Sequence, residues 1–128
     1  MNIKAKHQKL KDLIKKENLD CIILQKNNNI AWLSSGFDNR IVDKDRTGAI
    51  SLLVTSDQIK IITDNIEFNR IKEEGQLPAD WGIEVYNWYD GNSLIEEVLN
   101  QHTAGSDIYQ PGAKLIADQI RKIRYPLF

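Results

Sequence analysis

The feature that most constrains this chain is a run of four apolar residues, Cys-Ile-Ile-Leu at positions 21–24, which follows an amphipathic pattern. Between residues 3 and 18, apolar side chains recur at helical spacing against a face rich in lysine, which predicts a surface helix. A strand that is apolar on both faces needs cover on both faces, so positions 21–24 predict a buried strand. The first quarter of the chain therefore predicts a helix that leads into a buried strand.

The rest of the sequence alternates between patterns typical of strands and of helices. Two runs rich in β-branched residues, separated by Thr-Ser-Asp, predict an antiparallel hairpin at residues 49–54 and 58–62. Further strands are expected at residues 83–88 and 107–109. Further helices are expected at residues 27–33, 64–74, 93–105 and 113–123. This order predicts an α/β fold with three layers, α/β/α, around a mixed sheet of about five strands.

Composition sets the class of protein and excludes some partners. The chain has 128 residues, a formal net charge of −1 and one cysteine, Cys21, so one domain without an internal disulfide is expected. A net charge this small gives no field that would collect nucleic acid, and no stretch approaches the roughly 20 apolar residues of a membrane span. Without a recognisable signal peptide, we expect a cytoplasmic location and neither nucleic acid nor membrane as a partner.

The sequence contains no constellation that would perform chemistry on its own. His7 and His102 are isolated from each other and from Cys21, whereas a zinc site needs three or four nearby ligands. Cys21 lies in the predicted buried strand, and neither a Gly-x-Ser-x-Gly elbow nor a glycine-rich phosphate loop occurs. We therefore expect no catalytic residue, no cofactor and no metal within this chain.

Carboxylates give one alternative. Asp43, Asp64 and Glu67, together with Asp38 and Asp45, are the acids that could gather two metal ions on such a sheet, as in a two-metal phosphoesterase. The competing interpretation is structural, because Asp64 can cap a helix and Glu67 stands in its first turn.

A long polar segment after residue 33 is the most suggestive part of the sequence. Aromatic and charged side chains gather around it, and arginine there could hold a carboxylate while the rings line an apolar subsite. The candidates for residues close to a substrate are Trp32, Phe37, Asp38, Arg40 and Arg46. The alternative is that the rings belong to the core and the arginines to the surface.

Two segments resemble a known family. Residues 19–24, Leu-Asp-Cys-Ile-Ile-Leu, and residues 29–37, Asn-Ile-Ala-Trp-Leu-Ser-Ser-Gly-Phe, resemble the amino-terminal domain of the creatinase/prolidase/Xaa-Pro aminopeptidase family. The hairpin and the last strand and helix follow in the order of that domain. Trp32 stands where tyrosine is commoner in the family.

The resemblance implies a fold of the ribonuclease H-like type for residues 1–128. It also implies a separate catalytic "pita-bread" domain, absent from this chain, that holds two divalent metal ions (Mn, Co or Zn). The domain would form a homodimer or higher homo-oligomer and narrow access to the active site, with residues 37–46 near a substrate. The parent would be an Xaa-Pro aminopeptidase or dipeptidase, or a creatinase-like amidine hydrolase. The apolar tail at residues 124–128 leads us to expect that the native chain continues.

Overall fold

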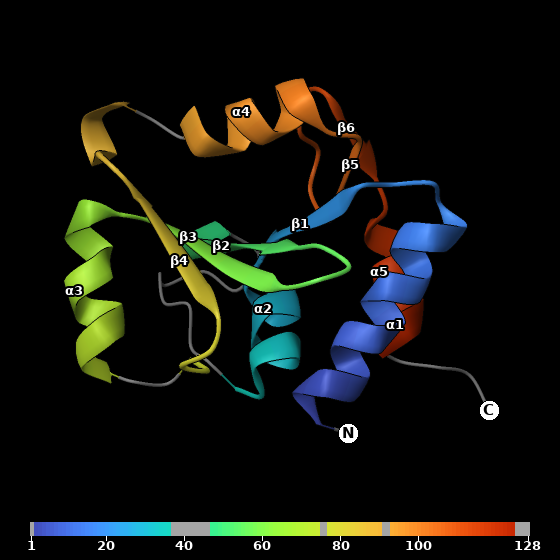
Figure 1. The fold of residues 1–128 in the computed structure, drawn as a ribbon, viewed down its shortest axis with the longest axis horizontal. Coiled ribbons are helices and arrows are strands. Elements are labelled where there is room, and N and C mark those ends of the chain that lie inside the picture. Colours follow the sequence, from blue (N-terminus) through green and yellow to red (C-terminus); the bar gives the residue numbers. More distant parts are fainter. Residues whose placement is uncertain (1, 37–46, 75–76, 91–92, 125–128) are drawn as a thin grey trace.

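The computed structural model describes residues 2–36, 47–74, 77–90 and 93–124, which form one sheet with helices on both sides (Figure 1). The strands are β1 (Cys21–Lys26), β2 (Thr47–Val54), β3 (Ile59–Asp64), β4 (Gly82–Tyr86), β5 (Ala104–Ser106) and β6 (Ala113–Leu115). The helices are α1 (Ile3–Lys16), α2 (Asn27–Ser34), α3 (Asn65–Glu74), α4 (Ser93–Gln101) and α5 (Ala117–Arg124), with a 3₁₀ turn at Trp88–Asp90. The expected α/β class is confirmed.

The sheet is mixed, and its order is β4-β3-β2-β1-β5-β6. Strand β2 is antiparallel to both of its neighbours, β1 and β3. At one edge β4 runs parallel to β3. On the other side β5 runs parallel to β1, and β6 runs parallel to β5. The expected hairpin is therefore β2–β3, with Leu52 opposite Ile61. The expected buried strand is β1, and its residues Ile22, Ile23 and Leu24 are fully buried near the middle of the sheet.

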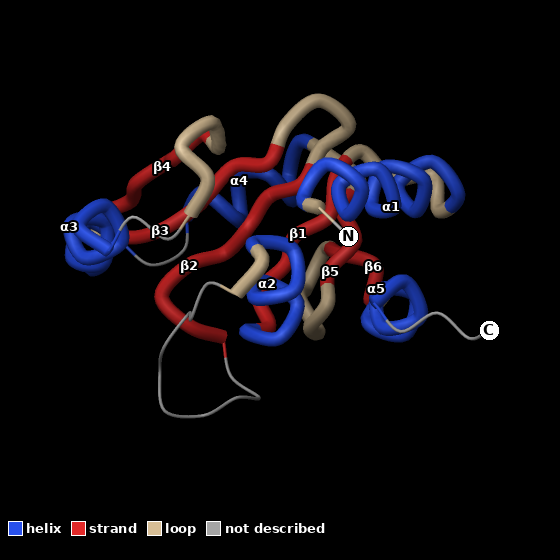
Figure 2. Tube along the Cα trace, turned by 90° about the horizontal axis from the view of Figure 1, so that it is seen from below, coloured by secondary structure: helices blue, strands red, loops and turns tan. Residues whose placement is uncertain are grey.

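The two faces of the sheet are covered unequally. On one face, α1, α2, α3 and α5 bury the larger apolar core, which contains Leu10, Ile30, Ile71 and Ile120. On the other face, α4 packs Ile95 over a smaller cluster that includes Cys21, Ile23 and Ile62. Figure 1 shows α4 above the strands and α2 below them, and Figure 2 shows the same layers from below. Helices on both faces confirm the predicted three layers.

Helix α1 forms as its pattern predicts. The Asn2 side chain accepts a hydrogen bond from the Ala5 amide at 2.8 Å, which caps the first turn, and Lys15 and Lys16 stand in the last turn, where cations suit the helix dipole. Leu10, Leu13 and Ile14 turn to the core. Among the described residues no helix has the length and apolar character needed to cross a membrane.

The expectations for residues 104–116 were wrong in two places. The strand is Ala104–Ser106 rather than residues 107–109, and a sixth strand occupies Ala113–Leu115, where a helix was expected. The reason is close packing, because a Cβ atom on Gly105 would lie 2.6 Å from Cδ1 of Ile116 and 2.7 Å from Cδ1 of Leu19. Small residues let β5 fit beneath these side chains, and pairing with β5 holds β6 extended.

Strand β4 lies at an edge of the sheet and is more exposed than its alternation predicted. Ile83 is 43% exposed and Val85 is 42% exposed, although both follow the period-2 pattern of a strand with one buried face. Glu84 pairs with Lys60 of the neighbouring strand at 2.8 Å. An edge strand has only one neighbour, so its apolar positions receive less cover than those of β1.

A buried carboxylate ties the middle of the sheet together. Asp107, which is 1% exposed, follows β5 and accepts hydrogen bonds from the Gln25 amide at 2.9 Å, the Lys26 amide at 2.9 Å and the Asn29 side-chain amide at 2.8 Å. Burial raises the pKa of Asp107, while the bonds from Asn29, Lys26 and Gln25 oppose the rise. One side chain thus joins the end of β1, the start of α2 and the end of β5.

We predict that Asp107→Asn lowers the free energy of unfolding by about 2 kcal/mol or more at neutral pH. The amide keeps the shape but turns an NH₂ group toward donors, and an unsatisfied buried donor costs about 1–3 kcal/mol. Urea unfolding followed by circular dichroism measures the change. The control is Asp118→Asn on the exposed face of α5, whose free energy of unfolding is expected to stay within about 0.5 kcal/mol of that of the unsubstituted chain. Equal stability of the two variants would show that the hydrogen bonds to Asp107 do not stabilise the fold.

Candidate functional site

The segment that carries most of the predicted site residues begins at the end of α2. Ser35 has a left-handed backbone with φ of 63°, and Gly36 follows with φ of 115°. The Gly36 amide donates to the Ala31 carbonyl at 2.8 Å, which closes the helix in a glycine-terminated cap. No atom stands within 4 Å of where a Cβ of Gly36 would be, so backbone conformation rather than space requires glycine there.

A buried lysine fixes the end of α2. The Lys6 ammonium donates to the Trp32 carbonyl at 2.6 Å and to the Ser35 hydroxyl at 3.2 Å, and it lies 5.7 Å from the centre of the Trp32 ring. Its side chain comes from α1 and is 9% exposed. A cation is favourable at a helix C-terminus and over an indole ring, so Lys6 stabilises both the cap and the ring.

The other end of the segment returns to the start of α2. Thr47, the first residue of β2, pairs with Lys26, and the register of the β1–β2 ladder shifts between Leu24 and Lys26. The Lys26 amide is one of the donors to Asp107. The two residues that flank positions 37–46, Gly36 and Thr47, are thus held at opposite ends of one short, well-anchored helix.

The structure places one of the five predicted substrate-proximal residues. Trp32 lies half-buried on α2 and packs against the larger core, while its ring contacts Lys6. Phe37, Asp38, Arg40 and Arg46 lie outside the described residues. Their grouping around a substrate stays a prediction.

The carboxylates of the alternative metal site have structural partners where they are described. Asp64 accepts the Glu67 amide at 2.8 Å and so caps α3, and Glu67 pairs with Arg70 at 2.6 Å. Asp38, Asp43 and Asp45 lie outside the described residues. Within the part of the chain that the structure describes, no group of three or more His, Cys, Asp or Glu side chains is placed to hold a metal ion. These contacts favour the structural interpretation of Asp64 and Glu67.

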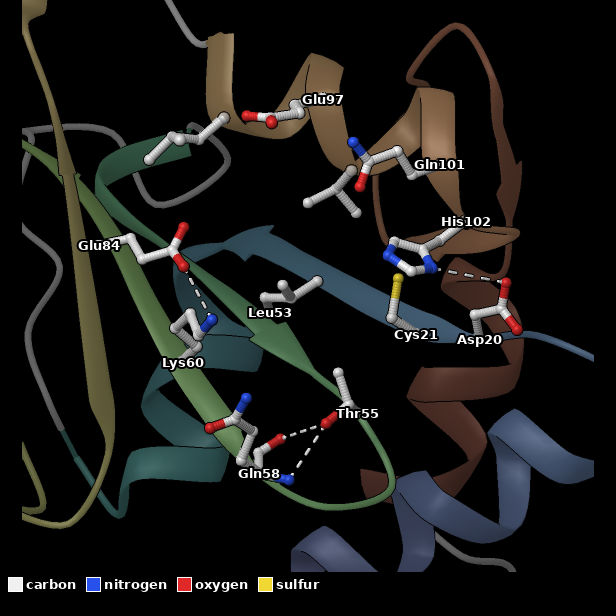
Figure 3. Close-up of a pocket in the computed structure, with 12 residues that line it drawn as sticks. Asp20, Cys21, Leu53, Thr55, Gln58, Lys60, Glu84, Glu97, Gln101 and His102 are labelled. Carbon is white, nitrogen blue, oxygen red and sulfur yellow. Dashed lines mark hydrogen bonds and ion pairs between the residues drawn. The ribbon is translucent and has the colours of Figure 1, made fainter.

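A hollow on the α4 face was not foreseen from the sequence. It has a volume of about 470 Å³ and lies between α4 and strands β1 to β4 (Figure 3). Its lining residues are Asp20, Cys21, Leu53, Thr55, Gln58, Lys60, Glu84, Leu94, Glu97, Val98, Gln101 and His102. They come from positions 20 to 102, so no local motif in the sequence marks the hollow. It exists because one helix covers this face of a six-stranded sheet.

One corner of the hollow brings a thiol, an imidazole and a carboxylate together. Figure 3 shows Cys21 beneath the His102 ring, and His102 Nδ1 lies 3.9 Å from a carboxylate oxygen of Asp20. Cys21 is 3% exposed, and burial, with a smaller effect of the Asp20 charge, raises its pKa to about 11. A nucleophilic cysteine needs a lowered pKa and access to solvent, so this arrangement keeps the thiol protonated at neutral pH.

One protein-family model matches most of the chain. The family model described as the Creatinase/Prolidase N-terminal domain matches residues 6–119. No curated protein sequence matches the chain. The chain belongs to the creatinase/prolidase N-terminal domain family.

Solved structures with the same fold come from peptidases. The chain is similar to the prolidase from Pyrococcus horikoshii OT3, with a TM-score of 0.64 at 15% identity, over 93% of this chain and 34% of that one. It is also similar to the N-terminal domain of the cytoplasmic peptidase PepQ from Mycobacterium tuberculosis H37Rv, with a TM-score of 0.57 at 20% identity, over 93% and 84%.

A third structure, the Xaa-Pro dipeptidase from Bacillus anthracis, gives a TM-score of 0.58 at 15% identity, over 94% of this chain and 31% of that one. The chain therefore spans about a third of the length of this dipeptidase and of the Pyrococcus horikoshii prolidase.

We predict that Cys21 of the folded chain reacts slowly with iodoacetamide and that the rate still rises about tenfold per pH unit near pH 9, because its pKa is about 11. In the urea-unfolded chain the rate should level off near the ordinary thiol pKa of about 8.5. Mass spectrometry of timed samples measures both rates, and circular dichroism at each pH shows that the chain remains folded. A folded-state rate that levels off below pH 9 would show that the thiol is activated.

Proposed function

We propose that this chain is the non-catalytic N-terminal domain of an Xaa-Pro peptidase and that it serves assembly and control of access to the active site. The observation that carries the proposal is the family match over residues 6–119. The share of the prolidase and dipeptidase chains that this domain covers supports it, since about two thirds of each lies outside the common fold. The catalytic domain would be that further part of the parent protein.

The chemistry of peptide hydrolysis would belong to this second domain. Two divalent metal ions (Mn, Co or Zn) there would activate a water molecule at neutral pH, which is the contribution that metal ions make to hydrolases of this kind. Among the described carboxylates, Asp64 caps α3, Glu67 pairs with Arg70, and Asp107 accepts hydrogen bonds inside the sheet. We assign no catalytic residue to this chain.

The gating role rests on how residues 37–46 are attached. A segment that reaches toward a neighbouring active site has to be held at both ends, because every freely moving residue adds an entropic cost to substrate binding. Gly36 and Thr47, which flank it, are fixed through the Lys6 contacts at one end of α2 and the β1–β2 ladder at the other. We propose that Phe37, Asp38, Arg40 and Arg46 extend from this base, with Trp32 beside it.

The names of the similar structures favour a peptidase over a creatinase-like amidine hydrolase. They are described as a prolidase, an Xaa-Pro dipeptidase and a cytoplasmic peptidase. We therefore propose an Xaa-Pro peptide as the substrate class of the parent and the cytoplasm as its location. A homodimer or a higher homo-oligomer, with a ribonuclease H-like domain in each subunit, is part of the same proposal.

We expect the purified chain to show no hydrolysis of Xaa-Pro peptides with added Mn²⁺ or Co²⁺. We also expect the gene to encode, beyond Phe128, a further domain of about 200 residues or more, a usual scale for an α/β domain. That domain should carry two Asp, one His and two Glu as metal ligands. Turnover that survives repurification and is abolished by a substitution within this chain would overturn the proposal, as would a gene without such a domain.

A second prediction concerns Arg40 and Arg46 in the longer protein. Alanine at whichever arginine pairs with a substrate carboxylate should lower kcat/KM about ten- to a hundredfold, because a charge-assisted hydrogen bond contributes about 1.5–3 kcal/mol. Metal content and Tm should be unchanged. Arg121→Ala on the exposed face of α5 is the control. Unaltered kinetics in both single variants and in the double variant would show that the segment does not touch substrate.

A further inference from the structure

The hollow beneath α4 has the size and the apolar floor of a site for a small molecule. Its volume of about 470 Å³ falls within the roughly 300–1,000 Å³ that ligand pockets occupy. Figure 3 shows Leu53 on its floor, between α4 on one side and the paired Lys60 and Glu84 on the other. The partly buried Leu94 and Val98 of α4 add to the apolar surface. A short aliphatic chain therefore has apolar side chains to contact inside the hollow.

Helix α4 turns one face toward the hollow. Its lining residues stand at helical spacing, since the two apolar ones alternate with two polar ones: Leu94, Glu97, Val98 and Gln101. In the described parts of the chain, the side chains of Glu97 and Gln101 form no hydrogen bond and no ion pair. They are four positions apart and so lie next to each other along the helix. A carboxylate and an amide oxygen of this helix are thus available to accept hydrogen bonds from a ligand.

The other carboxylates of the hollow already have partners. Glu84 pairs with Lys60 at 2.8 Å. Asp20 accepts the Thr103 amide at 2.8 Å and lies 3.9 Å from the His102 ring. Three carboxylates and one ammonium, with the imidazole neutral, give the lining a formal charge of −2. This charge repels an acidic ligand and attracts a cation.

The thiol of Cys21 completes the lining at one corner. It is 3% exposed, and within the described residues no hydrogen bond reaches it. Burial, with a smaller effect of the Asp20 charge, raises its pKa to about 11, so the thiol is neutral at physiological pH. A neutral sulfur that donates only weakly suits contact with the apolar part of a ligand rather than with its charge.

We propose that the hollow binds a small organic cation, a primary ammonium on a short aliphatic chain. The ammonium would donate hydrogen bonds to Glu97 and to the side-chain oxygen of Gln101, and the chain would lie over Leu53 and Val98. An ammonium has three donors and no acceptor, which matches two acceptors that have no other partner. This site is separate from the proposed peptidase function and is tested on the 128-residue chain alone.

Three molecules with the same chain and different charge test the sign of the site. Hexylamine should bind with a dissociation constant on the millimolar scale, 1-hexanol at least about threefold more weakly, and hexanoate not measurably, because exposed ion pairs contribute about 0.2–1 kcal/mol. Titration followed by two-dimensional amide NMR measures all three. Absence of binding by hexylamine overturns the site. Hexanol or hexanoate binding as tightly as hexylamine overturns the assignment of a cation.

A matched pair of variants tests the position of the ammonium. Glu97→Gln should raise the dissociation constant of hexylamine about three- to fivefold and leave that of hexanol unchanged. Glu96→Gln makes the same charge change at the neighbouring exposed position of α4, outside the hollow, and should alter the affinity by less than about 1.5-fold. Circular dichroism shows that both variants fold. Equal weakening by the two variants would reduce the effect to net charge and overturn the contact with Glu97.

Chain length and location test the apolar contact. Butylamine should bind at least about threefold more weakly than hexylamine, because each buried CH₂ group contributes up to about 0.8 kcal/mol. The largest amide shifts should fall on α4 and on the lining residues of β2 and β3. Equal affinity of the two amines overturns the apolar contact. Shifts that centre on α1 and α5 would place the amine elsewhere and overturn the hollow as its site.

Discussion

The fold depends on the need of one buried carboxylate for hydrogen bonds. Asp107 is buried, and it accepts hydrogen bonds from the amides of Gln25 and Lys26 and from the side chain of Asn29. These amides stand where β1 gives way to α2, where a helix start leaves backbone donors without partners. Lys26 occupies the cap position of α2 and makes no side-chain capping bond, and its own amide is bound by the carboxylate of a residue far along the chain.

The sequence predicted those helices and strands whose own residues show the spacing of the element they form. The spacing of Leu10, Leu13 and Ile14 predicted α1, and the β-branched runs predicted the hairpin, because each pattern matches the period of the element it forms. The strand at residues 104–106 could not be foreseen in this way, since Ala-Gly-Ser has little tendency to be extended. It is a strand because the neighbouring β1 supplies hydrogen bonds and Leu19 leaves room only for glycine.

In the candidate site too, the features formed by neighbouring residues could be predicted, and the contacts between distant residues could not. Trp32 and the end of the helix near residue 33 were predicted from residues 27–37, whereas the cap that Ser35 and Gly36 form there is a finding of the structure. Lys6 was read only as part of a lysine-rich face, yet it lies buried against the end of α2, a contact that joins residues 26 positions apart. The hollow under α4 was likewise invisible in the sequence, as its walls come together only when the sheet has formed.

The sheet order also separates early contacts from late ones. The pairing of β2 with β3 joins residues that are close in sequence, and β4 returns to β3 after one helix, so residues 47–86 can organise with little loss of chain entropy. The pairing of β1 with β5 closes a loop of about eighty residues, and the bond from the Gln25 amide to Asp107 spans 82 positions. Topology of this kind slows the final step of folding. We therefore expect β5, β6 and α5 to join the structure last, and the same unit to be the first to detach when the native state opens locally.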